Sequence, residues 1–175
     1  MAEIYNYFSE MLKYPSDQTW PLVNKAMHIG TEEVRSKLEN FCSGAPRSLE
    51  KLEELYIGTF EVSPTACLYA GYTVFGETFK RSHLLVGLKD LLARAQIQTD
   101  DGGNIELPDH IPLLLRFLGT EDCGTTEERN ELVRFLLFPA LIKALDDLRK
   151  NTNPYAFVIE ALMEILTRDF QESLQ

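Results

Sequence analysis

Apolar residues recur every three or four positions along most of this chain, the spacing that places them on one face of an α-helix. The first such stripe consists of Ile4, Phe8, Met11 and Leu12, and it ends before Pro15. Further stripes occupy residues 17–30, 31–42, 48–60, 76–95, 110–118, 125–148 and 153–166. Alternation at every second residue is rare, and no internal repeat is present. The pattern predicts one all-α domain, residues 1–175, folded as a helical bundle of about eight helices.

Capping residues predict where several of these helices begin. Helix starts are expected at Asp17 or Ser16, Thr31, Ser48, Thr125 and Asn153. Thr125 and Glu128 have the spacing of a capping box, in which each residue satisfies a backbone N–H of the other. Pro139 lies inside the stripe that follows and lacks a backbone donor, so it should kink or break that helix.

Two segments give a weaker pattern. Residues 62–75 contain Pro64, Gly71 and several aromatic or β-branched residues, so helix, strand and loop all stay open. The run from Thr99 to Asn104, with two aspartates and two glycines, is a strong turn signal.

Composition narrows the possible functions. The 175-residue chain has a net charge of −10, which disfavours nucleic-acid binding, because phosphate neutralisation requires clustered Lys and Arg. The N-terminus lacks the basic and apolar regions of a signal peptide, and no stretch approaches the roughly 18 apolar residues that span a bilayer. Three cysteines without CxxC spacing are typical of a reducing compartment and argue against a disulfide framework or a zinc site. We therefore expect a cytoplasmic protein.

The stretch ELPDHIPLLLRFL, residues 106–118, carries the most distinctive polar residues. Asp109 is suited to cap the helix that follows, and Pro112 falls in its first turn, where a missing N–H costs nothing. Neighbouring helical residues point about 100° apart, so Asp109 and His110 do not form a catalytic dyad with each other. The other histidines, His28 and His83, have no metal-ligand spacing, and we expect neither a metal nor a cofactor.

Two interpretations of this junction stay open. In the first, Glu106, Asp109 and His110 are solvated polar residues at a helix start. In the second, they form a polar mouth on an apolar groove that binds a helical or extended peptide.

Several short motifs resemble one known family. The stretch 106–118 resembles the signature of NarJ-type chaperones, the nitrate reductase delta-subunit family, which are similar to the TorD and DmsD maturation proteins. Further matching segments, in order, are Leu12-x-Tyr14-Pro15, Leu55-Tyr56-x-x-Thr59-Phe60-Glu61, Leu68-Tyr69, Gly76-Glu77 with Arg81, and Asn153-Pro154-Tyr155-Ala156. Together these segments cover most of the chain.

The resemblance implies a helical cytoplasmic chaperone that is not an enzyme. Family members bind the catalytic subunit of a molybdenum oxidoreductase, often through its N-terminal segment, while molybdenum cofactor and iron–sulfur clusters are inserted. On this hypothesis the client-binding residues are Tyr56, Phe60, Tyr69, Glu106, Asp109, His110 and Pro112. His110 would donate to a client carbonyl and tune release through its charge near neutral pH, while core packing is the alternative role for the aromatic residues. A rival hypothesis is a small helical hydrolase or nucleotide-binding protein that uses His110 as its base.

Overall fold

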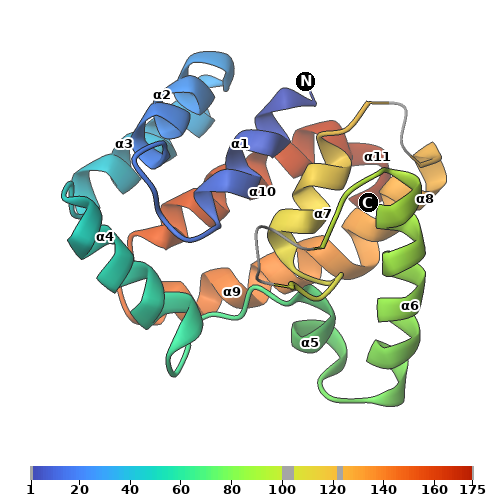
Figure 1. Cartoon of the computed structure of the whole chain (residues 1–175). Helices are drawn as coiled ribbons and strands as arrows, with labels where there is room; N and C mark the ends of the chain where they lie inside the picture. Colours follow the sequence, from blue (N-terminus) through green and yellow to red (C-terminus); the bar gives the residue numbers. More distant parts are fainter. Residues whose placement is uncertain (1, 100–104, 122–123, 175) are drawn as a thin grey trace.

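The computed structural model describes residues 2–99, 105–121 and 124–174, and helices make up most of it (Figure 1). In chain order they are α1 (Glu3–Met11), α2 (Thr19–Ile29), α3 (Glu32–Gly44), α4 (Leu49–Tyr56), the π-helical η1 (Ile57–Glu61), α5 (Ala70–Phe75), α6 (Phe79–Arg94), α7 (Ile111–Leu118), α8 (Thr126–Leu132), the π-helical η2 (Val133–Leu137), α9 (Phe138–Lys150), α10 (Tyr155–Asp169) and α11 (Gln171–Leu174). With π-helical segments joined to their neighbours, the described residues form ten helices, eight of at least seven residues, and no strand. The predicted all-α fold of about eight helices is confirmed.

Helices α1 and α10 lie at the centre of the molecule (Figure 1). Helix α10 packs against α3 and α9, and α1 packs against α2 and α7. Helices α2, α3 and α4 lie on one side of this centre, whereas α5, α6 and α8 lie on the other (Figure 1). Helix α7, which follows the Asp109–His110 pair, therefore lies against the central helix α1.

The stripes identified from the sequence form the core. Ile4, Phe8, Met11 and Leu12 are at most 3% exposed, and the apolar side chains of α7 are almost completely buried. The buried apolar residues of the described chain belong to one cluster. Because burial of this surface is the main favourable contribution to folding, these stripes fix which face of each helix points inward.

Two of the predicted helix starts are confirmed by their hydrogen bonds, and a third, Ser48, is the N-cap residue of α4 without a side-chain bond to the helix. The Thr31 side chain accepts from the N–H of Val34, and Thr125 and Glu128 form the reciprocal capping box. The predicted cap at Asn153 is one residue too early, because Pro154 is the N-cap residue of α10. The Asn153 side chain still accepts from the N–H of Tyr155, the first residue of the helix, at 3.0 Å.

The predicted cap of α2 at Ser16 or Asp17 is wrong. The helix begins at Thr19, and its N-cap residue is Gln18. The Ser16 hydroxyl accepts from the N–H of Gln18 at 3.3 Å and thereby stabilises the turn before the helix. A side-chain acceptor this close to a turn serves the turn as readily as the helix.

Pro139 is accommodated by a change in helical winding. The chain passes from α8 through η2 into α9, and Pro139 falls in the first turn of α9, where its missing N–H needs no partner. Within the ambiguous segment 62–75, the helical part is α5. Of the predicted turn at 99–104, all but Thr99 lies outside the described residues.

Candidate functional site

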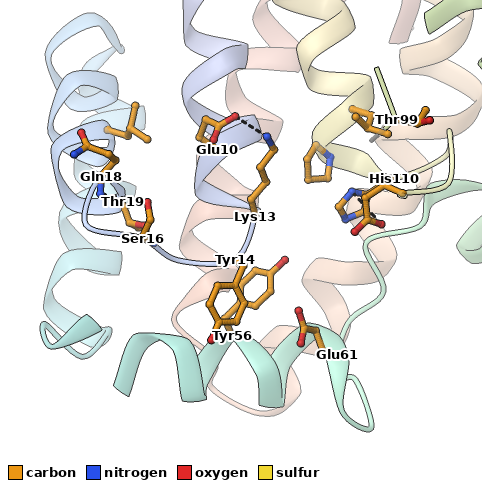
Figure 2. Close-up of a pocket in the computed structure, with 14 residues that line it drawn as sticks. Glu10, Lys13, Tyr14, Ser16, Gln18, Thr19, Tyr56, Glu61, Thr99 and His110 are labelled. Atoms are coloured by element: carbon orange, nitrogen blue, oxygen red, sulfur yellow. Dashed lines mark hydrogen bonds and ion pairs between the residues drawn. The ribbon is translucent and has the colours of Figure 1, made fainter. Parts of the chain in front are cut away.

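An open pocket of about 450 Å³ lies where α1, the α1–α2 loop, α4, η1 and the start of α7 meet (Figure 2). Three carboxylates line it, those of Glu10, Glu61 and Glu106, together with one lysine, Lys13. The Lys13 ammonium lies 2.8 Å from the Glu10 carboxylate. Two negative charges are therefore in excess, and we call this site the acidic pocket.

Local chain geometry explains how these residues meet. Helix α1 ends at Met11, and the following loop carries Tyr14, which is 49% exposed, to the edge of the pocket. The hydroxyl of Tyr56 donates to the carbonyl of Leu12 at 3.1 Å and joins α4 to this loop. The rings of Tyr14 and Tyr56 pack edge to face at 5.7 Å. The π-helical turn η1 then extends α4 to Glu61, on the far side of the pocket.

Four of the seven residues predicted from the sequence line the acidic pocket, and three do not. The four are Tyr56, Glu106, His110 and Pro112. Phe60, Tyr69 and Asp109 are not part of the pocket lining.

Phe60 belongs to an aromatic cluster in the core. Its ring lies 5.0 Å from that of Tyr155 and 5.1 Å from that of Tyr56, measured between centroids. Tyr56 itself is only 4% exposed. These two aromatic rings therefore support the pocket wall, which agrees with the core-packing alternative.

Tyr69, Glu106 and His110 form a polar group at the entrance to α7. The Tyr69 hydroxyl donates to Glu106 Oε2 at 2.7 Å, and His110 Nδ1 lies 3.8 Å from the same oxygen. The Tyr69 and His110 rings stack at 5.1 Å, and their backbones form an isolated antiparallel bridge. Tyr69 therefore lies behind the pocket lining and contacts two of its residues, Glu106 and His110.

Burial sets the ionisation of this group. Removal from water lowers the pKa of His110, although the carboxylates of Glu106 and Asp109 partly oppose the shift. Burial and the hydrogen bond to Glu106 raise the pKa of the Tyr69 hydroxyl. At neutral pH the imidazole is neutral, so a change of charge at His110 belongs to more acidic conditions than those expected from the sequence.

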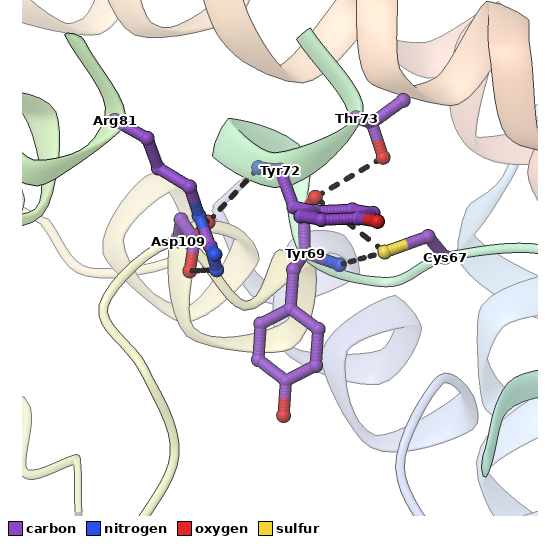
Figure 3. A network of polar contacts seen from close by, with 6 residues as sticks. All are labelled: Cys67, Tyr69, Tyr72, Thr73, Arg81 and Asp109. Carbon is purple, nitrogen blue, oxygen red and sulfur yellow. Dashed lines mark hydrogen bonds and ion pairs between the residues drawn. The ribbon is translucent and has the colours of Figure 1, made fainter. Parts of the chain in front are cut away.

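Asp109 is placed differently from the prediction. It is completely buried, the N-cap residue of α7 is His110, and Asp109 Oδ2 accepts from Arg81 Nε at 3.0 Å and from the N–H of Tyr72 at 3.2 Å (Figure 3). Gly71 makes this approach possible, because a Cβ there would lie 2.7 Å from Asp109 Oδ2. The predicted cap at Asp109 is wrong, because the N-cap residue of α7 is His110. The Asp109 carboxylate is directed into the protein, where it links α7 to α5 and α6.

Several residues of the acidic pocket were not predicted from the sequence. Glu10, Lys13 and Tyr14 come from the end of α1 and its loop, and Glu61 comes from η1. Tyr14 and Glu61 both stand in segments that carry the family resemblance, and this was the available signal. Nothing local in the sequence shows that these segments face Glu106.

Within the described ranges, no three His, Cys, Asp or Glu side chains are arranged to hold a metal ion. Among the same residues, no helix combines the length and apolar character needed to cross a membrane.

The described part of the chain is thus all-helical, with an open acidic pocket beside the start of α7. The chain belongs to the nitrate reductase delta subunit family, whose model matches residues 24–156. It is also 28% identical over 168 residues to the probable nitrate reductase molybdenum cofactor assembly chaperone NarJ of Bacillus subtilis strain 168. The match covers 93% of this chain and 87% of that relative. The resemblance noted from the short motifs is thereby confirmed.

Proposed function

We propose that this chain is a chaperone for the assembly of a nitrate reductase, and not an enzyme. Family membership and the relative named for molybdenum cofactor assembly support this function. The client is the catalytic subunit, which the chaperone holds while the client receives its molybdenum cofactor. The cofactor thus belongs to the client, and the chaperone works in the cytoplasm, where such a subunit is made.

The acidic pocket is the proposed binding site for the N-terminal segment of the client. Its excess of two carboxylates favours a segment with a basic side chain, because complementary charge speeds encounter and selects the partner. Tyr14 offers a half-exposed aromatic face to the same side chain. His110 and Glu106 lie together at the pocket wall and present polar atoms to the client backbone.

A peptide-binding experiment tests this site. The ligand is a synthetic peptide with the N-terminal sequence of the nitrate reductase catalytic subunit from the same organism, and its Kd is measured by calorimetry. Glu61→Gln and Glu106→Gln should each weaken binding roughly three- to tenfold, and added salt should weaken binding to the wild type. Glu127→Gln is the control, because this acid is exposed on α8, outside the pocket.

Two results would overturn the proposal at different levels. If the Kd of the peptide changes neither with added salt nor in the two pocket variants, the acidic pocket is not the binding site. If nitrate reductase acquires its full molybdenum content in cells that lack this chain, the chain does not have the proposed assembly function.

The rival hydrolase or nucleotide-binding hypothesis gains no support from the comparisons, because the matched family and relative are named for nitrate reductase and its assembly. The polar partner of His110 is Glu106, which also accepts from Tyr69. This arrangement positions an imidazole at a pocket wall, and the chaperone proposal uses it as a hydrogen-bonding group.

A further inference from the structure

A second depression, of about 350 Å³, is lined mainly by residues of α6 and of the α8–η2 segment. Two apolar stripes form its walls: Leu84, Leu88 and Leu91 on α6, and Leu132, Phe135 and Leu136 on α8–η2. Both stripes have the spacing of a helix face. We call this depression the apolar groove; it shares no lining residue with the acidic pocket.

The apolar groove is open to solvent. Phe135 is 61% exposed and Leu84 is half-buried, whereas the other four residues of the two stripes are buried. A groove between two helices with a buried apolar floor and an exposed aromatic edge is the kind of surface into which a third, amphipathic helix packs.

Gly87 is the most informative residue of this groove. It lies in the interior of α6, where glycine weakens a helix relative to alanine. A Cβ at this position would meet no atom within 4 Å, and the backbone has no positive φ that calls for glycine. Neither packing within the described chain nor local conformation explains the residue. A bare backbone at a groove does permit close approach by another helix.

The charges beside the groove indicate what kind of helix it accepts. Arg94 and Glu128 neutralise each other, with their nearest atoms 2.5 Å apart. Glu131 also lines the groove, is exposed, and has no ion-pair partner in the part of the chain that the structure describes. Among the lining residues, the Glu131 carboxylate is therefore left to pair with an occupant, while the neighbouring Arg134 guanidinium lies over the Phe135 ring, 5.4 Å from its centroid. A second copy of this chain would bring the same carboxylate and a net charge of −10, so electrostatics favour a different, basic partner.

We propose that the apolar groove docks an amphipathic helix of the client catalytic subunit, separate from the segment at the acidic pocket. The helix carries apolar residues at positions i, i+3 or i+4, and i+7, and a Lys or Arg that faces Glu131. This inference rests on the proposed function, since it takes its partner from there. Two sites of opposite character would let one chaperone hold two parts of an immature client, and joint engagement raises the combined affinity above that of either site.

Photo-crosslinking tests the identity of the occupant. A benzoylphenylalanine replaces Phe135 in the full chain, which is mixed with purified, cofactor-free catalytic subunit and irradiated. Mass spectrometry should place the cross-links on a client helix with the stated apolar spacing and basic residue. The same probe at Ile29, which is 50% exposed at the end of α2, is the control and should give few cross-links.

A matched pair of substitutions tests the groove without unfolding it. Gly87→Leu fills open space and improves helix propensity, so its melting temperature should match or exceed that of the wild type. Its Kd for the cofactor-free subunit should nevertheless rise roughly tenfold, as when a central interface contact is blocked. Ser82→Leu adds the same side chain to an exposed position of α6 outside the groove and should leave the Kd unchanged.

The outcomes separate the two proposals. Cross-links on a second copy of the chain, or on a client segment without the stated pattern, overturn the groove assignment, as does an unchanged Kd for Gly87→Leu. If the wild-type chain fails to bind the catalytic subunit at all, the proposed function itself is overturned. Helix-specific cross-links together with weakened binding by Gly87→Leu support the groove.

Discussion

Replacing Asp109 with alanine should destabilise the fold far more than a surface substitution does. The carboxylate is completely buried, and it accepts hydrogen bonds from Arg81 and from the N–H of Tyr72. Alanine would leave the guanidinium without its counter-charge and the N–H without an acceptor. The cost therefore comes from unpaired polar groups rather than from lost packing alone.

The structure sets the expected magnitude. Removing one partner of a buried ion pair costs about 3–5 kcal/mol, and the Arg81 side chain, at 15% exposure, keeps some contact with water. We therefore expect Asp109→Ala near the lower end, at about 3 kcal/mol. Arg81→Met leaves the fully buried carboxylate unpaired and should cost about 4–5 kcal/mol. For a chain of this length, a loss of 3 kcal/mol lowers the melting temperature by about 6–12 °C.

Urea unfolding followed by circular dichroism measures these free energies. In the double variant Asp109→Ala/Arg81→Met, the loss of unfolding free energy should be smaller than the sum of the losses in the two single variants. Each single substitution leaves the other charged group buried without its partner, and the double variant does not. A loss below about 1 kcal/mol for Asp109→Ala, the range of exposed ion pairs, would refute the buried-pair argument.

Three further predictions concern the same region. Leu114→Asp places an unpaired charge at a fully buried site and should cost more than about 4 kcal/mol in urea unfolding, whereas Val86→Asp, at 65% exposure, should change the stability by less than about 0.5 kcal/mol. Gly71→Ala puts a Cβ 2.7 Å from the Asp109 carboxylate and should cost about 1–3 kcal/mol by calorimetry. Burial lowers the pKa of His110 below 6.5, so its contribution to stability is complete above pH 6.5 and is lost as the pH falls through the folded-state pKa; His110→Gln should flatten this part of the stability–pH curve.

Each of these predictions has a clear contrary result. Equal losses for Leu114→Asp and Val86→Asp would contradict the inward face assigned to α7. A neutral Gly71→Ala would mean that α5 and Asp109 separate readily. A wild-type curve that stays level below pH 6.5, or a His110→Gln curve with the same slope, would show that His110 does not titrate in the way its burial requires.

Periodicity predicted the helices well because it reports directly on burial. The stripe of Ile4, Phe8, Met11 and Leu12 needed no knowledge of its partners, since any helix with such a face must bury it. The Thr125 capping box was equally predictable, because both of its partners lie within one turn. A π-helical segment such as η2 does not produce a distinct spacing of apolar residues, so the way in which the helix accommodates Pro139 could be seen only in the structure.

The candidate site was predicted in part, and distance along the chain explains the difference. Asp109 satisfies every local rule for an N-cap, but Arg81 and Tyr72, far back in the sequence, supply its partners instead. The side of the acidic pocket formed by Glu10 and Glu61 likewise depends on how α1 and η1 meet α7. Local patterns fix which residues are polar at a junction, whereas tertiary contacts decide whether those residues face solvent, a ligand or each other.

The buried ion pair also determines which substitutions can test the two binding sites. Asp109 directly precedes His110, a residue of the acidic pocket, and Arg81 lies in the first turn of α6, which forms one wall of the apolar groove. The pair therefore lies beside both sites without lining either one, and a variant at Asp109 would weaken binding at either site through the scaffold alone. Glu106→Gln and Gly87→Leu leave this pair intact. If each affects a different segment of the client, the two sites are separate; if both affect the same segment, that segment must run from the pocket to the groove.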